Sequence, residues 1–148
     1  MRKVDVSTIG FTKTTAERFF DRIRTAQVRN VMDVRLHNTS QLAGFAKSED
    51  LAFFLKNLCG AEYSHKPILA PTDDMLKAYK KDKGDWRVYE NSFLSLMSGR
   101  RIEERFKPEV FDQACLLCSE DKPHHCHRRL VVEYLNSKWG SVLSVKHL

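Results

Sequence analysis

The chain has 148 residues, of which 42% are hydrophobic and 30% are charged, and its formal net charge is +6. This composition is typical of one globular domain that buries a core without help from a disulfide or a metal. No apolar run approaches the roughly 20 residues that a membrane helix needs. Charged residues interrupt residues 1–20, so we expect no signal peptide. We therefore expect a cytoplasmic protein.

The positive charge is concentrated in the first part of the chain. Residues 1–60 hold ten Lys and Arg against six Asp and Glu, whereas residues 61–110 and 111–148 each have an excess of only one positive charge. Such a balance suits an anionic ligand or a nucleic acid, although a solvated basic surface explains it equally well.

The first predicted elements are a strand and a helix. Residues 4–10 alternate apolar and polar side chains and end at Gly10, which predicts a strand. Residues 14–26 place their apolar side chains on one face, which predicts a helix. Thr14 and Glu17 have the spacing of a capping box, so Thr14 is expected to cap this helix.

The same alternation of strands and helices continues to the end of the chain. Further strands are predicted over residues 28–36, 61–65, 111–118 and 141–147. Further helices are predicted over residues 48–60, 72–83, 86–99, 101–106 and 125–138. Ser48 is expected to cap the helix that it begins.

This order of elements predicts an α/β fold in one domain, residues 1–148. We expect a three-layer sandwich with a mainly parallel sheet of about five strands. The apolar run in residues 111–118 suits a strand that is covered on both faces. The helices over residues 65–108 form a helical insertion between the third and fourth strands, which could be a lid or additional core.

Polar residues stand at the ends of the predicted strands. Open parallel sheets bind ligands at the carboxyl ends of their strands, beside a switch in strand order. The residues expected along this edge are Thr8, Gly10, Asp33, Arg35, His65, Cys118 and Glu120. Their convergence predicts a ligand site at this edge of the sheet.

Asp33 and Arg35 are two residues apart on a predicted strand, so their side chains point to the same face. One explanation is a structural ion pair. The other is functional: Arg35 presents its planar guanidinium to a phosphate or carboxylate while Asp33 orients it. The sequence leaves both open.

The segment LLCSEDKPHHCHRR, residues 116–129, joins a strand to the last helix. Residues 125–128 form the first turn of that helix, where backbone N–H groups and the helix dipole favour an anion. The same field favours a thiolate at Cys126. Arg128 and Arg129 add positive charge, and we expect at most one of them to face the site.

The cysteines of this segment also suggest a metal site. Cys115 and Cys118 are at an odd offset in a strand and point to opposite faces, so Cys115 is interpreted as a core residue. Cys118, Cys126 and one or two histidines then remain as possible zinc ligands. Because the cytoplasm keeps thiols reduced, metal or thiol roles are favoured over disulfides.

Two known phosphate-handling motifs are absent. Cysteine phosphatases have an arginine six positions after the nucleophilic cysteine, in the same loop. In this chain, the residues six positions after Cys118 and Cys126 are His124 and Val132. The segment GFTKTT after the first strand lacks the Gly-Lys-Ser/Thr of a P-loop.

Four segments of the chain match a known family in order. TIG at residues 8–10, DVR at 33–35, YSHKPILAPT from residue 63 and LLCSEDKPHHCHR ending at residue 128 resemble the domain of unknown function 488 family. The resemblance covers nearly the whole chain and implies a compact α/β domain without an assigned activity. It places the family pattern on Thr8, Gly10, Asp33, Arg35, Tyr63, His65, Cys118, Glu120, Pro123, Cys126, His127 and Arg128. Cys115, His124 and His125 lie outside the pattern, which weakens a four-ligand zinc site.

The leading hypothesis is a protein that binds a phosphate-bearing ligand, either a nucleotide or a nucleic acid. Arg35, Arg128 and the start of the last helix would hold the anion. Further ligand-binding candidates are Thr8, Gly10, His65 and Cys126. In an enzyme of nucleotide or nucleic-acid processing, Asp33, Glu120 or His127 would be the acid or base, with Cys118 or Cys126 as a less favoured nucleophile.

Two alternatives differ in class from this hypothesis. The first is a non-catalytic protein whose cysteines and histidine hold a structural metal. The second is sequence-independent nucleic-acid binding through the basic first half of the chain. The leading hypothesis assigns no metal ligand, no cofactor and no protein partner, and His37 and His147 have no predicted role.

Overall fold

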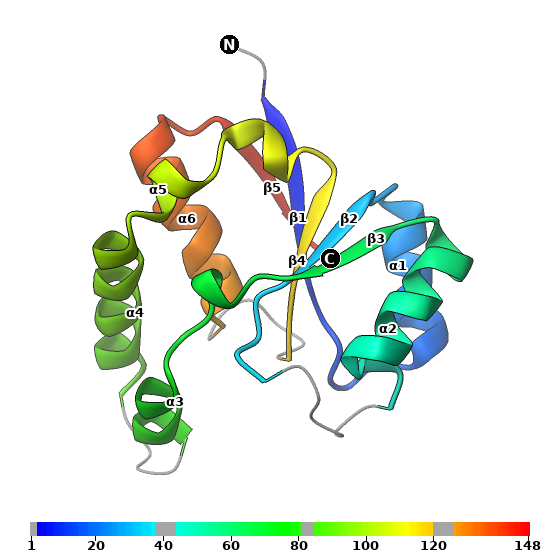
Figure 1. Ribbon diagram of the computed structural model, residues 1–148, viewed down its shortest axis with the longest axis horizontal. Coiled ribbons are helices and arrows are strands. Elements are labelled where there is room, and N and C mark those ends of the chain that lie inside the picture. The colour runs from blue at the N-terminus through cyan, green and yellow to red at the C-terminus, as the bar shows by residue number, and fades with distance from the viewer. Residues whose placement is uncertain (1–2, 38–43, 81–84, 120–125) are drawn as a thin grey trace.

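The computed structural model describes residues 3–37, 44–80, 85–119 and 126–148. In these residues, five strands form one all-parallel sheet in the order β3-β2-β4-β1-β5 (Figure 1). The strands are β1 (Val4–Gly10), β2 (Asn30–Asp33), β3 (Glu62–His65), β4 (Ala114–Cys118) and β5 (Leu143–His147). The predicted α/β fold with its parallel sheet is confirmed.

Helices cover both faces of the sheet. In the described residues, these are α1 (Ala16–Thr25), α2 (Ser48–Phe54), α3 (Asp73–Lys80), α4 (Trp86–Arg100), α5 (Ile102–Arg105) and α6 (His127–Trp139). Figure 1 shows α1 and α2 on one side of the sheet and α4 and α6 on the other. This is the expected sandwich of three layers. No helix in the described parts of the chain is both long and apolar enough to cross a membrane.

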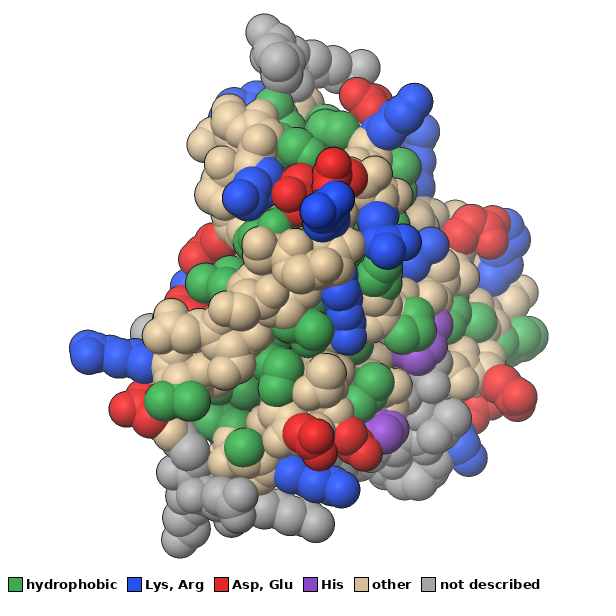
Figure 2. Space-filling view, turned by 60° about the vertical axis from the view of Figure 1, so that its left-hand side comes forward, with side chains coloured by type: hydrophobic (Ala, Val, Ile, Leu, Met, Phe, Trp, Pro, Cys, Tyr) green, Lys and Arg blue, Asp and Glu red, His purple; other side chains and the backbone are tan. Residues whose placement is uncertain are grey.

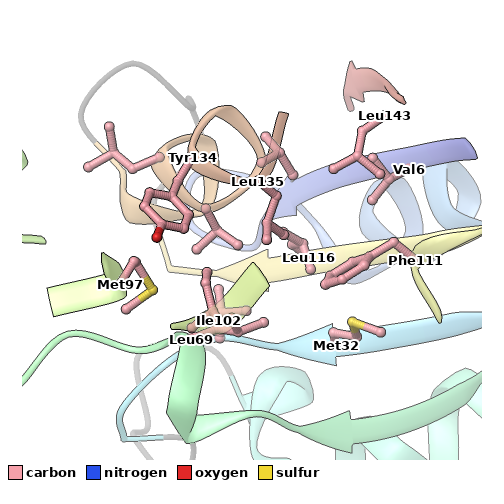
Figure 3. Packing of buried hydrophobic residues seen from close by; sticks show 14 of the residues in the cluster. Val6, Met32, Leu69, Met97, Ile102, Phe111, Leu116, Tyr134, Leu135 and Leu143 are labelled. Atoms are coloured by element: carbon pink, nitrogen blue, oxygen red, sulfur yellow. The ribbon is translucent and has the colours of Figure 1, made fainter. Parts of the chain in front are cut away.

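Strand β4 lies at the centre of the sheet, and all of its side chains are buried. Leu116 and Cys118 face the core beneath α4 and α6, while Cys115 and Leu117 face the core beneath α1 and α2. Figure 3 shows Leu116 together with Leu135 of α6 in the first of these cores. The prediction that Cys115 and Cys118 point to opposite faces is confirmed, and Cys115 is a core residue.

Helices α3 to α5 lie between β3 and β4, which confirms the predicted helical insertion. Phe93 and Met97 of α4 are fully buried in the same core as Leu116, and α4 packs against α6. The insertion therefore supplies a large part of one core.

The predicted caps of two helices are wrong by one residue. Helix α1 is capped by Thr15, whose Oγ1 accepts a hydrogen bond of 3.2 Å from the backbone N–H of Arg18, and not by Thr14. Helix α2 begins at Ser48, but the capping position is Lys47, which makes no side-chain cap. A sequence pattern locates the start of a helix only to within one or two residues.

The strand order locates the place where a ligand would bind. β1 and β4 are neighbours, and Gly10 at the end of β1 pairs with Cys118 at the end of β4. The chain leaves β1 towards α1 on one face and leaves β4 towards α6 on the other face. In open α/β sheets, ligands bind outside the carboxyl ends of the strands at such a switch.

Candidate functional site

The structure brings the predicted residues to the expected edge, but in two clusters on opposite faces of the sheet. Asp33, Arg35, Tyr63 and Phe11, the first cluster, lie on the side of α1 and α2. The second cluster comprises Thr8, Cys118, Cys126 and Arg128 on the side of α6. Gly10 lies between them at the end of β1, whereas Glu120 and Pro123 fall outside the described residues.

Asp33 and Arg35 form a buried ion pair. Oδ1 of Asp33 accepts hydrogen bonds from the backbone N–H and from Nε of Arg35, at 3.1 and 2.8 Å. Oδ2 accepts from Nη2 of Arg35 at 2.7 Å and from the hydroxyl of Tyr63 at 2.5 Å. Because its two oxygens already accept four hydrogen bonds, this carboxylate is suited to orienting Arg35 rather than to taking a proton.

The guanidinium of Arg35 is fixed on three sides. Besides its bonds to Asp33, Nη2 donates to the carbonyl oxygen of Ala46 at 2.8 Å, and the group lies 5.0 Å from the ring centroid of Phe11. The side chain of Arg35 is only 4% exposed. Its Nη1 is buried and has no hydrogen-bond partner among the described residues. A buried charged donor without a partner is costly.

Two histidines hold the backbone between the clusters. Nε2 of His127 lies 2.7 Å from the carbonyl oxygen of Val34, and Nε2 of His65 lies 2.7 Å from that of Arg35. A carbonyl oxygen only accepts, so both rings carry a proton on Nε2. The two imidazoles therefore fix the segment that follows β2 and, with it, the position of Arg35.

The second cluster is centred on Arg128, which is fully buried. Its Nε donates to Oγ1 of Thr8 at 3.2 Å, and its Nη1 donates to Sγ of Cys118 at 3.3 Å. Oγ1 of Thr8 also lies 2.5 Å from Nδ1 of His147. Oγ1 of Thr8 therefore links Arg128 to His147. Burial, and then the nearby charge of Arg128, lowers the pKa of His147.

The structure pairs Cys118 with Cys126 as a disulfide, whereas the sequence indicated reduced thiols. The expectation came from the assumed compartment. The fold places the residue that precedes α6 over the end of β4, so the two buried sulfur atoms meet. Cys115 remains a free thiol, and burial raises its pKa to about 12, so it is not a nucleophile.

One group of side chains in the described residues has the chemistry of a metal site. The sulfur atoms of Cys118 and Cys126 and a ring nitrogen of His127 lie within 4.8 Å of one another. The disulfide occupies two of these three atoms in this state, so the group can accept a metal only after reduction.

Two pockets lie away from the candidate edge. A pocket of about 440 Å³ is lined by Ser7, Gln113 and Lys146, nearer to the amino ends of the strands. A smaller one of about 220 Å³ lies between α3 and α4. Figure 2 shows the side of the molecule that faces left in Figure 1, where apolar side chains are interspersed with charged ones.

Sequence reasoning missed several members of the two clusters. His147 had no predicted role, although a parallel register between the first and last strands places it opposite Thr8. Tyr63 belongs to the family pattern but was not assigned to the site. Phe11 and the carbonyl oxygen of Ala46 carry no signal in the sequence, because only the fold brings them to Arg35.

The fold and the site together define a parallel α/β protein with buried polar clusters at its strand ends. Residues 15–135 match the family described as Domain of unknown function DUF488, and the chain belongs to this family. The resemblance seen in the sequence is thereby confirmed. Comparison of the chain with curated proteins and with solved structures gives no match.

Proposed function

We propose that this protein binds a phosphate-bearing ligand, a nucleotide or the end of a nucleic acid, at the carboxyl edge of its sheet. The observation that carries this proposal is the buried Nη1 of Arg35, which has no hydrogen-bond partner in the described residues. A phosphate oxygen would complete the hydrogen bonding of this group. Charge-assisted bonds from arginine to phosphate are among the stronger hydrogen bonds in proteins.

The guanidinium is organised before the ligand arrives. Nε and Nη2 of Arg35 donate to Asp33 and to the carbonyl oxygen of Ala46, and the ring of Phe11 lies against the guanidinium. Nη1 is therefore the nitrogen that remains to donate to a ligand. Binding then costs little side-chain entropy, because Arg35 is already held in a single conformation. In this proposal Asp33 is a positioning residue.

Helix α6 supports the same proposal from the other side of the edge. Its first turn contains His127 and the buried Arg128, and the capping residue Cys126 makes no side-chain hydrogen bond to the backbone. The dipole of a helix and the backbone N–H groups of its first turn favour an anion. The two features together form a positive environment at the ends of β1, β2 and β4.

If the bound molecule is processed, we propose His127 and His65 as the proton-transfer groups. Each donates from Nε2 to a backbone carbonyl, so proton transfer by either ring would involve Nδ1. Glu120 remains a proposed acid or base from the sequence alone. Cys118 and Cys126 are nucleophiles only in a reduced protein.

The test is a binding titration with inorganic phosphate, a nucleoside monophosphate and a short single-stranded oligonucleotide. Arg35→Lys keeps the charge but loses the planar group, and we expect it to weaken binding by tenfold or more. Arg24→Ala, which removes an exposed cation on α1, is the matched control and should change affinity little. Equal affinity of wild type and Arg35→Lys for every ligand that binds would refute the proposal.

A further inference from the structure

Beyond this anion site, we propose that Cys118, Cys126 and His127 bind one zinc ion when the two cysteines are reduced. Cys118 ends β4, and Cys126 and His127 begin α6. The three ligand atoms lie within 4.8 Å of one another, and both cysteines are almost fully buried. Two thiolates and an imidazole form a ligand set that selects zinc over the hard cations Mg²⁺ and Ca²⁺.

The backbone spacing of the two cysteines suits a shared ion. Their Cα atoms are 7.6 Å apart. With Zn–S bonds of about 2.3 Å, two sulfurs on one tetrahedral ion are roughly 3.8 Å apart. An ion between the sulfurs therefore fits this wide spacing with little movement of β4 or α6.

His127 already has the orientation of a metal ligand. Its Nε2 donates to the carbonyl oxygen of Val34 at 2.7 Å, and its ring lies 5.4 Å from that of Phe93. Histidines that bind metals characteristically donate their second ring N–H to a carbonyl or carboxylate, which fixes the tautomer. The coordinating atom would be Nδ1, and Val34 would be the residue that holds the ring in place.

The charges around the cluster also fit. Two thiolates neutralise the charge of a Zn²⁺ ion, so the bound ion adds no net charge beside the buried Arg128. Nη1 of Arg128 donates to Sγ of Cys118 at 3.3 Å and would continue to stabilise that thiolate. Three protein ligands leave the fourth position of a tetrahedral ion for water or for an anionic ligand at the same edge.

Binding requires that the disulfide be opened first. A phosphine reductant and one water molecule convert the Cys118–Cys126 bond into two thiols: the phosphine loses two electrons and takes the oxygen, and the two protons go to the sulfurs. The zinc ion then displaces these two protons as it binds the thiolates. The oxidised protein should bind no ion at this site.

The test uses Co²⁺ as a spectroscopic substitute for Zn²⁺ on the reduced full chain. We expect one equivalent of Co²⁺ to give the visible bands of a tetrahedral ion and a thiolate-to-cobalt band in the near ultraviolet, and one equivalent of Zn²⁺ to abolish both. Cys126→Ser removes a ligand but supplies a favourable helix cap, so the fold should be kept while affinity falls about 100-fold or more. Cys115→Ala is the matched control and should bind as the wild type does.

Two results would overturn the proposal. One is the absence of a thiolate band in the reduced wild type with one equivalent of Co²⁺. The other is wild-type binding by both Cys126→Ser and His127→Gln, which would place the ion elsewhere. If circular dichroism shows that Cys126→Ser does not fold, Co²⁺ binding by His127→Gln alone tests the site. Phosphate binding is measured separately and does not enter this test.

Discussion

At the scale of single residues, buried hydrogen bonds between polar side chains organise the carboxyl edge of the sheet. The same-face placement of Asp33 and Arg35 followed from their spacing, and the structure shows them as a buried pair with a salt bridge of 2.7 Å. The contact between Thr8 and His147 joins residues 139 positions apart. Local pattern holds no information on such a contact, because it depends on the register of two strands.

The free thiol of Cys115 gives a prediction on pH. Burial raises its pKa from 9.0 to about 12, so the folded state keeps a proton that the unfolded state loses. This contribution to stability is complete below about pH 9 and is lost as the pH rises towards 12. Between about pH 8 and pH 10 we expect the free energy of unfolding to fall by about 1 kcal/mol through this group.

Urea denaturation of the wild type and of Cys115→Ala at these two pH values is the measurement. The variant should be less stable than the wild type at both pH values, because the substitution leaves a small cavity. Its free energy of unfolding should, however, fall by about 1 kcal/mol less than that of the wild type between the two pH values. Equal losses in the two proteins would contradict the burial of an un-ionised thiol.

At the scale of elements, the apolar run of β4 predicted a strand with both faces covered, and this was right because a buried strand needs no alternation. The predicted strand over residues 28–36 was too long. β2 covers only Asn30–Asp33, because the backbone N–H of Arg35 donates to the carboxylate of Asp33 instead of to a neighbouring strand. The sequence also did not predict the disulfide between Cys118 and Cys126. It depends on where the fold places the start of α6 relative to the end of β4, which composition does not encode.

The start of α1 gives a prediction at this scale. Thr15 accepts a hydrogen bond from the backbone N–H of Arg18, so Thr15→Ala should lower the free energy of unfolding by about 1 kcal/mol. Thr14→Ala is the matched control, because Thr14 receives only a long side-chain bond of 3.4 Å from Arg22, and it should cost less than half as much. Chemical denaturation of both variants measures these free energies of unfolding. A larger decrease for Thr14→Ala than for Thr15→Ala would show that Thr14 caps the helix, as the sequence predicted.

At the scale of the whole molecule, the net charge of +6 leaves two modes of binding to nucleic acid. A single phosphate held at the sheet edge gives a shallow dependence on salt, whereas a basic surface that covers several phosphates gives a steep one. The logarithm of affinity falls with the logarithm of salt concentration by about 0.7 for each phosphate contacted on a single strand.

We therefore predict a slope between about −0.7 and −1.4 for a short single-stranded oligonucleotide, as expected for one or two phosphates. Fluorescence anisotropy between about 50 and 200 mM salt measures it. A slope steeper than about −4 that is the same in Arg35→Lys would instead support binding through the basic first half of the chain.

The most direct test of the central claim is an NMR titration that follows the guanidinium ¹H–¹⁵N resonances of Arg35 while a nucleoside monophosphate is added. A phosphate on Nη1 should shift these resonances along a saturable curve, with the same midpoint for the backbone N–H groups at the start of α6. Saturable binding that leaves the resonances of Arg35 unchanged would show that the ligand binds elsewhere, and would contradict the account.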